Sequence, residues 1–416
     1  MKISVIGAGI IGVTTAYELA LDGHEVTVFD RRLAAAEESS FANAGIMAPG
    51  YIAPWAAPGM SLKIASHLLR RHAPVYFSLP LTRSELAWMW QCWRACRLGP
   101  FVRNRKNMQA LALYSRECLK QVSDDLQLEF DRSTGVLVLL RSERDHALIQ
   151  PSLQVMREAD IKFTECSADA ARKIELALNP DTPLHSAIHL PHDEAGNCRQ
   201  FALLLKNAAI AKGVNFAFNK TVESIDTSVG MCLQIAGEIA MQRFDAAVLC
   251  AGVDSARLLR PLGLKIPLAA VHGYSVSASV REPINAPRSA IIDERFKAAI
   301  TRLGNRVRVA GIAELGGQPG KLGASRLQTL YKLLQDWFPG AANIHNGVQV
   351  WKGARPMLPD GPPLIGASGI DKLWLNLGHG SSGWALSSGS ARGLADLIAG
   401  RKPVVDLQGF DVGRLA

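Results

Sequence analysis

The sequence predicts an α/β fold in which a Rossmann-like domain is interleaved with an α+β domain that carries a mostly antiparallel sheet. Three observations predict it. A glycine-rich turn joins a strand to a helix within residues 3–21, and a second unit of strand, glycines and helix spans residues 373–398. Between these units, strand-rich blocks alternate with helical patterns. No low-complexity linker separates the blocks, so we expect the chain to pass between the two domains several times.

The composition is that of a globular protein with more than one domain. The chain has 416 residues, of which 48% are hydrophobic and 20% charged, and this length favours two domains over a single core. Every apolar run is broken well before the ~20 residues that a membrane-spanning helix needs. Residues 3–6 are required as a strand by the motif that follows, so we expect no cleaved export signal. The seven cysteines are scattered and form no CxxC pair, which predicts a cytoplasmic location and no metal site.

The charge balance is basic. A formal net charge of +9 and an isoelectric point of about 9.3 suggest an anionic partner such as a membrane surface or an acidic small molecule, or else serve only solubility. No nucleic-acid-binding motif accompanies the charge, so we expect no nucleic acid partner.

The first chemical signal is the run Gly7-Ala8-Gly9-Ile10-Ile11-Gly12, which opens the first helix. A pyrophosphate must approach free backbone N–H groups at a helix N-terminus, and a side chain at Gly7 or Gly9 would block that approach. Gly12 lets the helix pack tightly on the strand. The next strand, residues 25–30, ends at Asp30, which can accept hydrogen bonds from the ribose hydroxyls and disfavours NADP. We therefore expect these residues, with Arg31, to bind a dinucleotide rather than to form a plain glycine turn.

A second strand-glycine-helix unit lies near the C-terminus. A strand at residues 373–377 is followed by Gly378-His379-Gly380-Ser381-Ser382-Gly383 and a helix to about residue 398. Such a unit can aim a second helix N-terminus at another part of the cofactor. If that part is the pyrimidine edge of a flavin, the helix dipole favours electron acceptance. A simple packing turn is the alternative, so the residues alone leave FAD and NAD open.

The remaining segments predict the rest of the architecture. Residues 37–60 form a long irregular stretch, which is usually functional in a compact domain. Helical patterns follow over residues 61–125, and strands are expected at 135–140 and in the block 271–310, with a helix near 325–337. Three further strands, within residues 213–216, 221–225 and 246–252, are expected to extend the first sheet.

Four stretches carry a resemblance to a known family. They are Ala42-Asn43-Ala44-Gly45 and residues 50–59, 353–361 and 378–380. Over essentially its whole length the chain resembles the FAD-dependent family that contains D-amino acid oxidase, glycine oxidase and sarcosine oxidase, and within it the bacterial D-amino acid dehydrogenases of the small-subunit type. The resemblance implies FAD as cofactor. It also implies an FAD-binding domain of residues 1–85, 191–262 and 346–416, and a substrate domain of residues 86–190 and 263–345.

The resemblance also assigns further cofactor contacts. The loop beside the flavin supplies Ser39, Ser40, Asn43, Ala44, Gly45 and Ile46, the strand at Val222 lies on the adenine side, and Ala251 and Gly252 lie near the pyrophosphate. The C-terminal turn supplies Gly378, Gly380, Ser381, Ser382 and Gly383. Two positions depart from the family: Ile46 replaces a frequent Gln, and Lys352-Gly353-Ala354 replaces a common Thr-Gly-Leu. Both positions are expected to face flavin or substrate, so the exact substrate stays open.

An amino-acid substrate brings a carboxylate, which a guanidinium can hold by two parallel hydrogen bonds. Arg355 matches the carboxylate-binding arginine of the family, although a lone arginine is more often part of a surface or domain-bridging ion pair. Tyr274 and Tyr51 can each donate a further hydrogen bond, or can be core aromatics. His379 is expected to contact the flavin rather than to act as a base.

No hydrolytic motif competes for the chemistry. With a neutral amine, hydride transfer from the Cα–H of an amino acid to flavin N5 needs alignment rather than a protein base. The product imine would hydrolyse to a 2-oxo acid and ammonia. The leading hypothesis is oxidation of D-amino acids. The alternatives are an oxidase or dehydrogenase for glycine, sarcosine, hydroxyproline or L-amino acids, and a non-catalytic nucleotide-binding protein with an acidic partner.

The electron acceptor is suggested by a cluster of aromatic and basic residues. Trp88, Trp90 and Trp93 precede five basic residues between 94 and 106, a pattern typical of a helix on an anionic bilayer, although such tryptophans more often form an inter-domain core. The dehydrogenases of the family are peripheral membrane proteins. The resemblance therefore implies a quinone or other electron-transfer acceptor and a peripheral location on the cytoplasmic face of the inner membrane.

Overall fold

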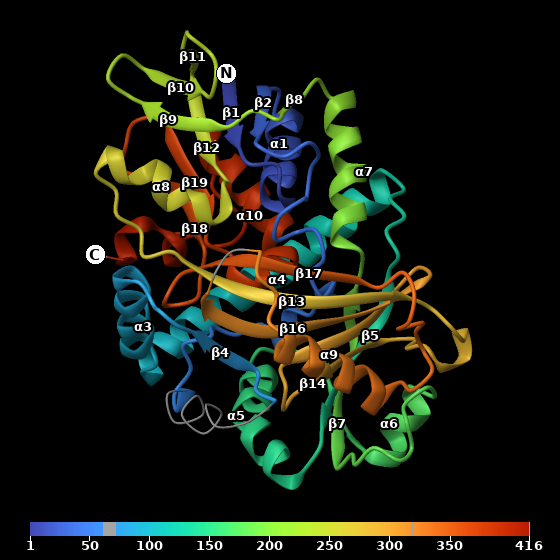
Figure 1. Ribbon diagram of the computed structural model, residues 1–416. Helices are drawn as coiled ribbons and strands as arrows, with labels where there is room; N and C mark the ends of the chain where they lie inside the picture. The colour runs from blue at the N-terminus through green and yellow to red at the C-terminus, as the bar shows by residue number, and fades with distance from the viewer. Residues whose placement is uncertain (61–71, 318–319, 416) are drawn as a thin grey trace.

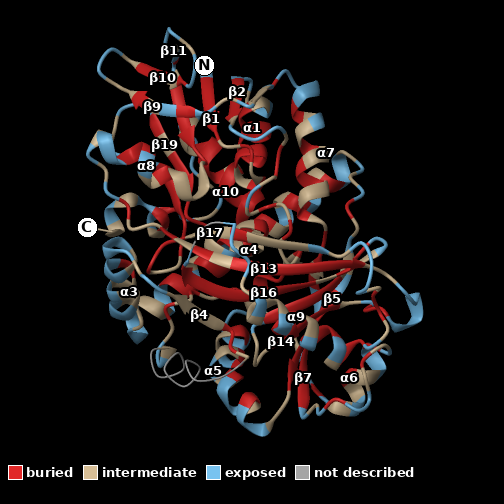
Figure 2. Cartoon of the chain, viewed as in Figure 1, coloured by how far each residue is buried: buried red, intermediate tan, exposed pale blue. Residues whose placement is uncertain are grey.

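The computed structural model describes residues 1–60, 72–317 and 320–415 and consists of two lobes, each built on its own sheet (Figure 1). The helical pattern expected over residues 61–71 lies outside the described residues. Strands of both sheets are buried and the outer helices expose one side to solvent (Figure 2). No helix of the described residues is long and apolar enough to span a membrane.

The first lobe contains a six-stranded sheet in the order β18-β19-β12-β1-β2-β8. All neighbouring strands are parallel except β18 and β19, as expected for a Rossmann-like domain. The strands are β1 (Lys2–Ile6), β2 (Glu25–Asp30), β8 (Asn215–Phe218), β12 (Ala246–Leu249), β18 (Leu364–Ala367) and β19 (Leu373–Leu377). One face packs against the helices α1 (Ile10–Leu21), α4 (Leu98–Asp125), α7 (Cys198–Ala211) and α10 (Gly383–Ile398).

The other face of this sheet is covered by a three-stranded antiparallel sheet and by α8 (Ser255–Leu259). The small sheet is formed by β9 (Val222–Asp226), β10 (Met231–Ile235) and β11 (Gln242–Phe244). The expectation that residues 221–225 extend the first sheet is therefore wrong, whereas those at 213–216 and 246–252 are confirmed by β8 and β12. The reason is that a short turn brings β10 back beside β9 and satisfies its backbone groups locally.

The second lobe contains a ten-stranded sheet in the order β17-β13-β16-β15-β14-β5-β7-β3, with β4 beside β16 and β6 beside β7. Only the pairs β5–β14 and β4–β16 are parallel, so the expected mostly antiparallel sheet is confirmed. The strands are β3 (Ile46–Met47), β4 (Val75–Ser78), β5 (Ser133–Leu140), β6 (Thr164–Ser167), β7 (Ser186–Ala195), β13 (Ala269–Ser279), β14 (Ala290–Asp293), β15 (Ala298–Leu303), β16 (Arg306–Gly316) and β17 (Gln349–Met357).

The ten-stranded sheet has one face toward solvent-side helices and one toward the first lobe. The helix α9 (Ala324–Trp337) covers the first face, in line with the helix expected near residues 325–337. On the opposite face, α5 (Glu143–Glu158) packs near β5 and β7, and α3 (Arg83–Ala95) packs near β13 and β17. A shorter helix, α6 (Ala168–Ile174), follows β6.

Part of the expected helical region is a strand. Residues 75–78 form β4 because Val75, Tyr76 and Phe77 favour a strand, and prolines at 74 and 80 flank the segment. The strands β3, β4 and β17 all belong to the ten-stranded sheet, although they lie in ranges expected for the FAD-binding domain. We propose to assign these three strands to the substrate domain.

Candidate active site

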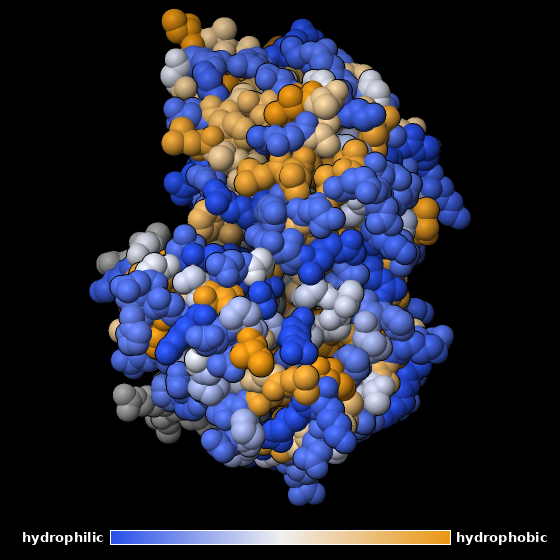
Figure 3. All heavy atoms as spheres, turned by 90° about the vertical axis from the view of Figure 1, so that its right-hand side faces the viewer, coloured by the Kyte–Doolittle hydropathy of each residue, from blue (hydrophilic) through white to orange (hydrophobic). Residues whose placement is uncertain are grey.

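A cavity of about 1770 Å³ lies where the two lobes meet, and it gathers nearly all the candidate site residues. Its size exceeds the roughly 300–1,000 Å³ of an ordinary small-molecule site, as a dinucleotide with a substrate requires. The outer surface is by contrast mostly hydrophilic on the face shown in Figure 3, with apolar residues in scattered groups. Of the residues expected at the cofactor or substrate, Gly12, Lys352 and Gly353 do not line the cavity.

The glycine turn between β1 and α1 has two kinds of glycine. A Cβ at Gly12 would overlap the carbonyl oxygen of Gly7, so Gly12 serves helix packing, as its role in the motif predicts. A Cβ at Gly9, however, would meet nothing closer than 3.5 Å, at Ser40 Oγ. The first turn of α1 also has no side-chain cap at Gly9. The N–H of Ile10 donates to Ser40 Oγ at 3.1 Å, and the open space before this helix N-terminus fits the pyrophosphate of a dinucleotide.

The ribose side is built around Asp30. Its carboxylate accepts hydrogen bonds from the backbone N–H groups of Ala8 at 2.6 Å and Arg32 at 2.8 Å, while burial raises its pKa. Arg31 forms ion pairs with Glu38, at 2.9 Å, and with Asp254. These pairs join the loop after β2 to the turn after β12 that contains Ala251 and Gly252.

Val222 lines the same end of the cavity although β9 is not part of the first sheet. Its carbonyl oxygen accepts a hydrogen bond from Arg257 Nη2 at 3.2 Å. The residue expected on the adenine side therefore lines the cavity from the three-stranded sheet and not from the six-stranded sheet.

The loop of residues 42–46 is held by the other lobe. Asn43 Oδ1 accepts from the N–H of Gly45 at 2.9 Å, and Gly45 adopts φ of 75°, which favours glycine. Two side chains of the ten-stranded sheet then fix the loop: Arg308 Nη1 donates to the Asn43 carbonyl at 3.1 Å, and Thr301 Oγ1 donates to the Ala44 carbonyl at 3.2 Å. Neither residue has a sequence motif around it, so sequence reasoning missed both.

The C-terminal turn places an uncapped helix N-terminus at the cavity. Gly378 and Gly380 have φ of 79° and 57°, and α10 begins at Gly383 without a side-chain cap. His379 is buried and its Nε2 lies 3.0 Å from Ser390 Oγ. Burial lowers the pKa of His379 to about 3, so its imidazole is neutral near pH 7 and is a weak base.

Arg355 is a charged side chain without an acidic partner among the ion pairs of the described residues. Its Nη1 donates to the carbonyl of Ile312 at 2.8 Å and its Nη2 to that of Gly311 at 3.4 Å. Burial lowers its pKa to about 10, so the guanidinium stays charged at pH 7. Ile312 has φ of 59°, which is unusual for a β-branched residue and turns its carbonyl toward Arg355. Arg355 thus forms no ion pair with the residues that the structure describes and can accept a carboxylate from a ligand.

The two expected tyrosines have other partners. The hydroxyl of Tyr274 donates to Glu314 Oε2 at 2.5 Å, and that carboxylate also pairs with Lys352 at 2.9 Å. Tyr274 is opposite Lys352 in the sheet and packs on the α9 side, whereas Arg355 is opposite Val271, which packs on the α3 side. The structure therefore does not bring the Tyr274 hydroxyl to Arg355. Lys352, which was expected to face flavin or substrate, does not line the cavity.

Tyr51 borders the cavity at a different place. Its hydroxyl donates to Glu294 and lies 3.3 Å from Lys297 Nζ. Glu314, Glu294 and Lys297 were not predicted, because only the sheet register brings them to the tyrosines.

The fold and the cavity define a dinucleotide-dependent enzyme with an arginine for an anionic substrate group, and the comparisons place it more closely. The chain belongs to the DAO family of FAD-dependent oxidoreductases, whose family model matches residues 2–397. It is 39% identical over 418 residues to a D-amino acid dehydrogenase of Bradyrhizobium diazoefficiens, covering 100% of this chain and 99% of that protein. The protein is therefore an FAD-dependent oxidoreductase that acts on amino acids, and the non-catalytic alternative is set aside.

Solved structures show the same fold. Glycine oxidase from Geobacillus kaustophilus matches with a TM-score of 0.78 at 20% identity, covering 99% of this chain and 98% of that chain. L-proline dehydrogenase from P. horikoshii matches with a TM-score of 0.76 at 17% identity, covering 100% and 97%. Both cover the two lobes, and the predicted fold class is confirmed.

Proposed function

We propose that the protein oxidises D-amino acids to 2-oxo acids and ammonia and passes the electrons to a respiratory-chain acceptor. The observation that carries the proposal is the partly buried guanidinium of Arg355, which has no acidic partner among the described residues and lies in the same cavity as both glycine turns. The relative that is 39% identical over the whole chain supports D-amino acids as the substrate class.

The side chains have separate tasks in this reaction. Bound FAD supplies the hydride acceptor, N5 of its ring. Arg355 uses two N–H groups for the carbonyls of Gly311 and Ile312, and its remaining N–H groups can hold the substrate carboxylate. The imidazole of His379 stays neutral and takes no proton, which agrees with a reaction on the neutral amine. The imine hydrolyses in water after it leaves the cavity.

Anaerobic titration of the purified yellow protein with paired D- and L-amino acids tests this function. Loss of the visible flavin absorbance with the D-enantiomer alone is the expected result. Bleaching by L-enantiomers, by glycine or sarcosine only, or by no amino acid would refute the proposed substrate class.

Exposed residues on α3 support the proposal that the electron acceptor is in a membrane. Trp88 is buried and its Nε1 donates to the carbonyl of Met357 at 2.9 Å, whereas Trp90 is 54% exposed and Trp93 is 59% exposed. The nearby Leu98 is 68% exposed, and Arg94 stacks on the Trp90 ring at 4.7 Å. Trp88 therefore fits the interpretation as a core residue, whereas Trp90 and Trp93 fit the interpretation as a membrane surface. We propose that the exposed part of this helix rests on an anionic bilayer.

Flotation with liposomes tests the membrane surface. We expect binding to anionic liposomes and weak binding to neutral ones, and we expect Trp90→Ser with Leu98→Ser to reduce it while dye-coupled activity is kept. The matched control is Val229→Ser with Ile239→Ser, which removes two exposed apolar residues from the first lobe. Equal flotation of both double variants would contradict the proposal.

A further inference from the structure

Two glycines form a hollow beside Arg355. Gly273 of β13 and Gly353 of β17 are directly opposite each other in the sheet. A Cβ at Gly273 would overlap Nη2 of Arg355, and a Cβ at Gly353 would overlap Cη2 and Cζ2 of Trp351. The guanidinium therefore lies on one glycine and the six-membered ring of the indole on the other.

Trp351 and Arg355 leave β17 on the same face, because side chains alternate along a strand and the two residues are four apart. Both line the cavity. Each is partly accessible, so the indole and the guanidinium form adjacent parts of one wall rather than a closed core. Because Gly273 and Gly353 have no side chains, the indole and the guanidinium have space to lie side by side.

The described residues beside this compartment include an apolar cluster. The residues that line it from β13, β16, β4 and α3 are Val271, Ala313, Leu315, Phe77 and Trp88. The acidic residues that line the cavity lie elsewhere. Asp30, Glu38, Glu223 and Asp254 are at the nucleotide end, and Asp145 and Glu294 are paired with Arg295 and Lys297.

The distance along the sheet keeps Glu294 away from Trp351. Glu294 directly follows β14, which is four strands from β17 in the sheet order. With neighbouring strands about 4.8 Å apart, this is roughly 19 Å along the sheet. A substrate whose carboxylate is at Arg355 therefore has beside its side chain an apolar wall, which Trp351, Val271 and Phe77 help to form.

We propose that Trp351 is a specificity-determining residue whose indole packs against the side chain of an apolar amino acid while Arg355 holds the carboxylate. This inference rests on the proposed function and adds the class of side chain, which should be aliphatic or aromatic. Gly353 is a positioning residue, since a Cβ there would overlap the indole ring and displace it.

Calorimetric titration of the holoenzyme with straight-chain carboxylates, from acetate to hexanoate, tests the wall without turnover. In the wild type each added methylene should tighten binding by up to about fourfold, the value for complete burial of the group. In Trp351→Ala the series should become nearly flat, while acetate, which needs only Arg355, should bind as before.

Three further variants check the result of Trp351→Ala. Gly353→Ala should flatten the series as Trp351→Ala does, and Trp351→Phe should give an intermediate slope if the alanine variant does not fold. Trp90→Ala is the matched control, because Trp90 is exposed on α3 and does not line the cavity, and its slope should equal that of the wild type.

The catalytic counterpart uses kcat/KM for D-alanine, D-norvaline, D-leucine, D-aspartate and D-lysine. The wild type should favour the apolar members, and Trp351→Ala should lose that preference. The inference would be overturned if the affinity of the wild type for carboxylates did not rise with chain length. It would also be overturned if the affinity of folded Trp351→Ala rose with chain length as steeply as that of the wild type. If the carboxylate series is steep but no amino acid reduces the flavin, the proposed function fails, and the assignment of the wall to amino-acid specificity fails with it.

Discussion

Arg355→Leu is expected to impair substrate binding severely without harming the fold. The guanidinium has two backbone carbonyl partners, at 2.8 and 3.4 Å, and no carboxylate partner among the described residues. A bound carboxylate would receive two charged hydrogen bonds, each contributing about 1.5–3 kcal/mol. Their loss amounts to about 3–6 kcal/mol, or roughly a 10²- to 10⁴-fold fall in kcat/KM.

The stability change should be small because two effects oppose each other. Leucine removes a buried charge that has lost its hydration, which is stabilising. It also leaves the carbonyl oxygens of Gly311 and Ile312 without these donors, which costs about 1–3 kcal/mol each at most. We therefore expect the free energy of unfolding to change far less than the substrate affinity, as measured by denaturant unfolding of both proteins.

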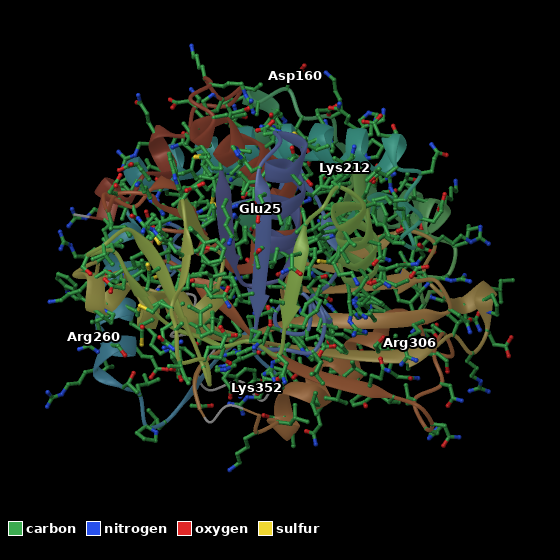
Figure 4. All side chains as sticks on the ribbon, turned by 90° about the horizontal axis from the view of Figure 1, so that it is seen from above. Glu25, Asp160, Lys212, Arg260, Arg306 and Lys352 are labelled. Atoms are coloured by element: carbon green, nitrogen blue, oxygen red, sulfur yellow. The ribbon has the colours of Figure 1, made fainter. Side chains whose placement is uncertain are left out.

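Initial rates with an artificial dye, measured across D-amino acid concentrations, provide the assay. Arg306→Leu is the matched control. Arg306 Nη2 also donates to backbone carbonyls, of Ser277 at 2.7 Å and Gly347 at 3.1 Å, but it does not line the cavity. Figure 4 shows it well apart from Lys352, which is close to Arg355 along β17. If folded, flavin-loaded Arg355→Leu kept the wild-type KM, the carboxylate role of Arg355 would be refuted.

Gly9→Ala should fold normally, since the new Cβ has 3.5 Å to Ser40 Oγ, but should bind FAD at least about tenfold more weakly because the pyrophosphate loses its approach. Gly12→Ala should lower the folding yield as well as the FAD affinity. Reconstitution with FAD, followed by flavin fluorescence, measures the affinity of each folded variant. Equal FAD affinity of Gly9→Ala and wild type would contradict the role of Gly9. Asp193 has a pKa that burial raises from 3.8 to about 7. Its folded form therefore binds more protons than the unfolded form between these values, so wild-type stability falls as pH rises through that range. Asp193→Asn should remove this loss and be more stable than the wild type by roughly a few kcal/mol at pH 8 but not at pH 4. If the difference in unfolding free energy, measured by urea unfolding, did not grow with pH, the raised pKa of Asp193 would be excluded.

The sequence determined those features that depend on neighbours along the chain. The glycine turn at Gly7 and Gly9, the strand ending at Asp30 and the glycines before α10 are visible because backbone conformation and side-chain periodicity are local properties. The lone Arg355 was identified through the family motif around it. The mostly antiparallel second sheet was also predictable, since its strands are separated by recognisable turns.

Only the tertiary structure decided which side chains meet across the sheets. The same alternation that made Tyr274 visible as a strand residue cannot say that Tyr274 packs on the α9 side, beside Glu314, while Arg355 is on the α3 side. The grip of Arg308 on the loop at Asn43, and the pairing of Gly273 with Gly353, join residues that are far apart in the chain. Strand register fixes these contacts, because a shift of one residue would turn every side chain to the opposite face, and register is set by the packing of the whole sheet.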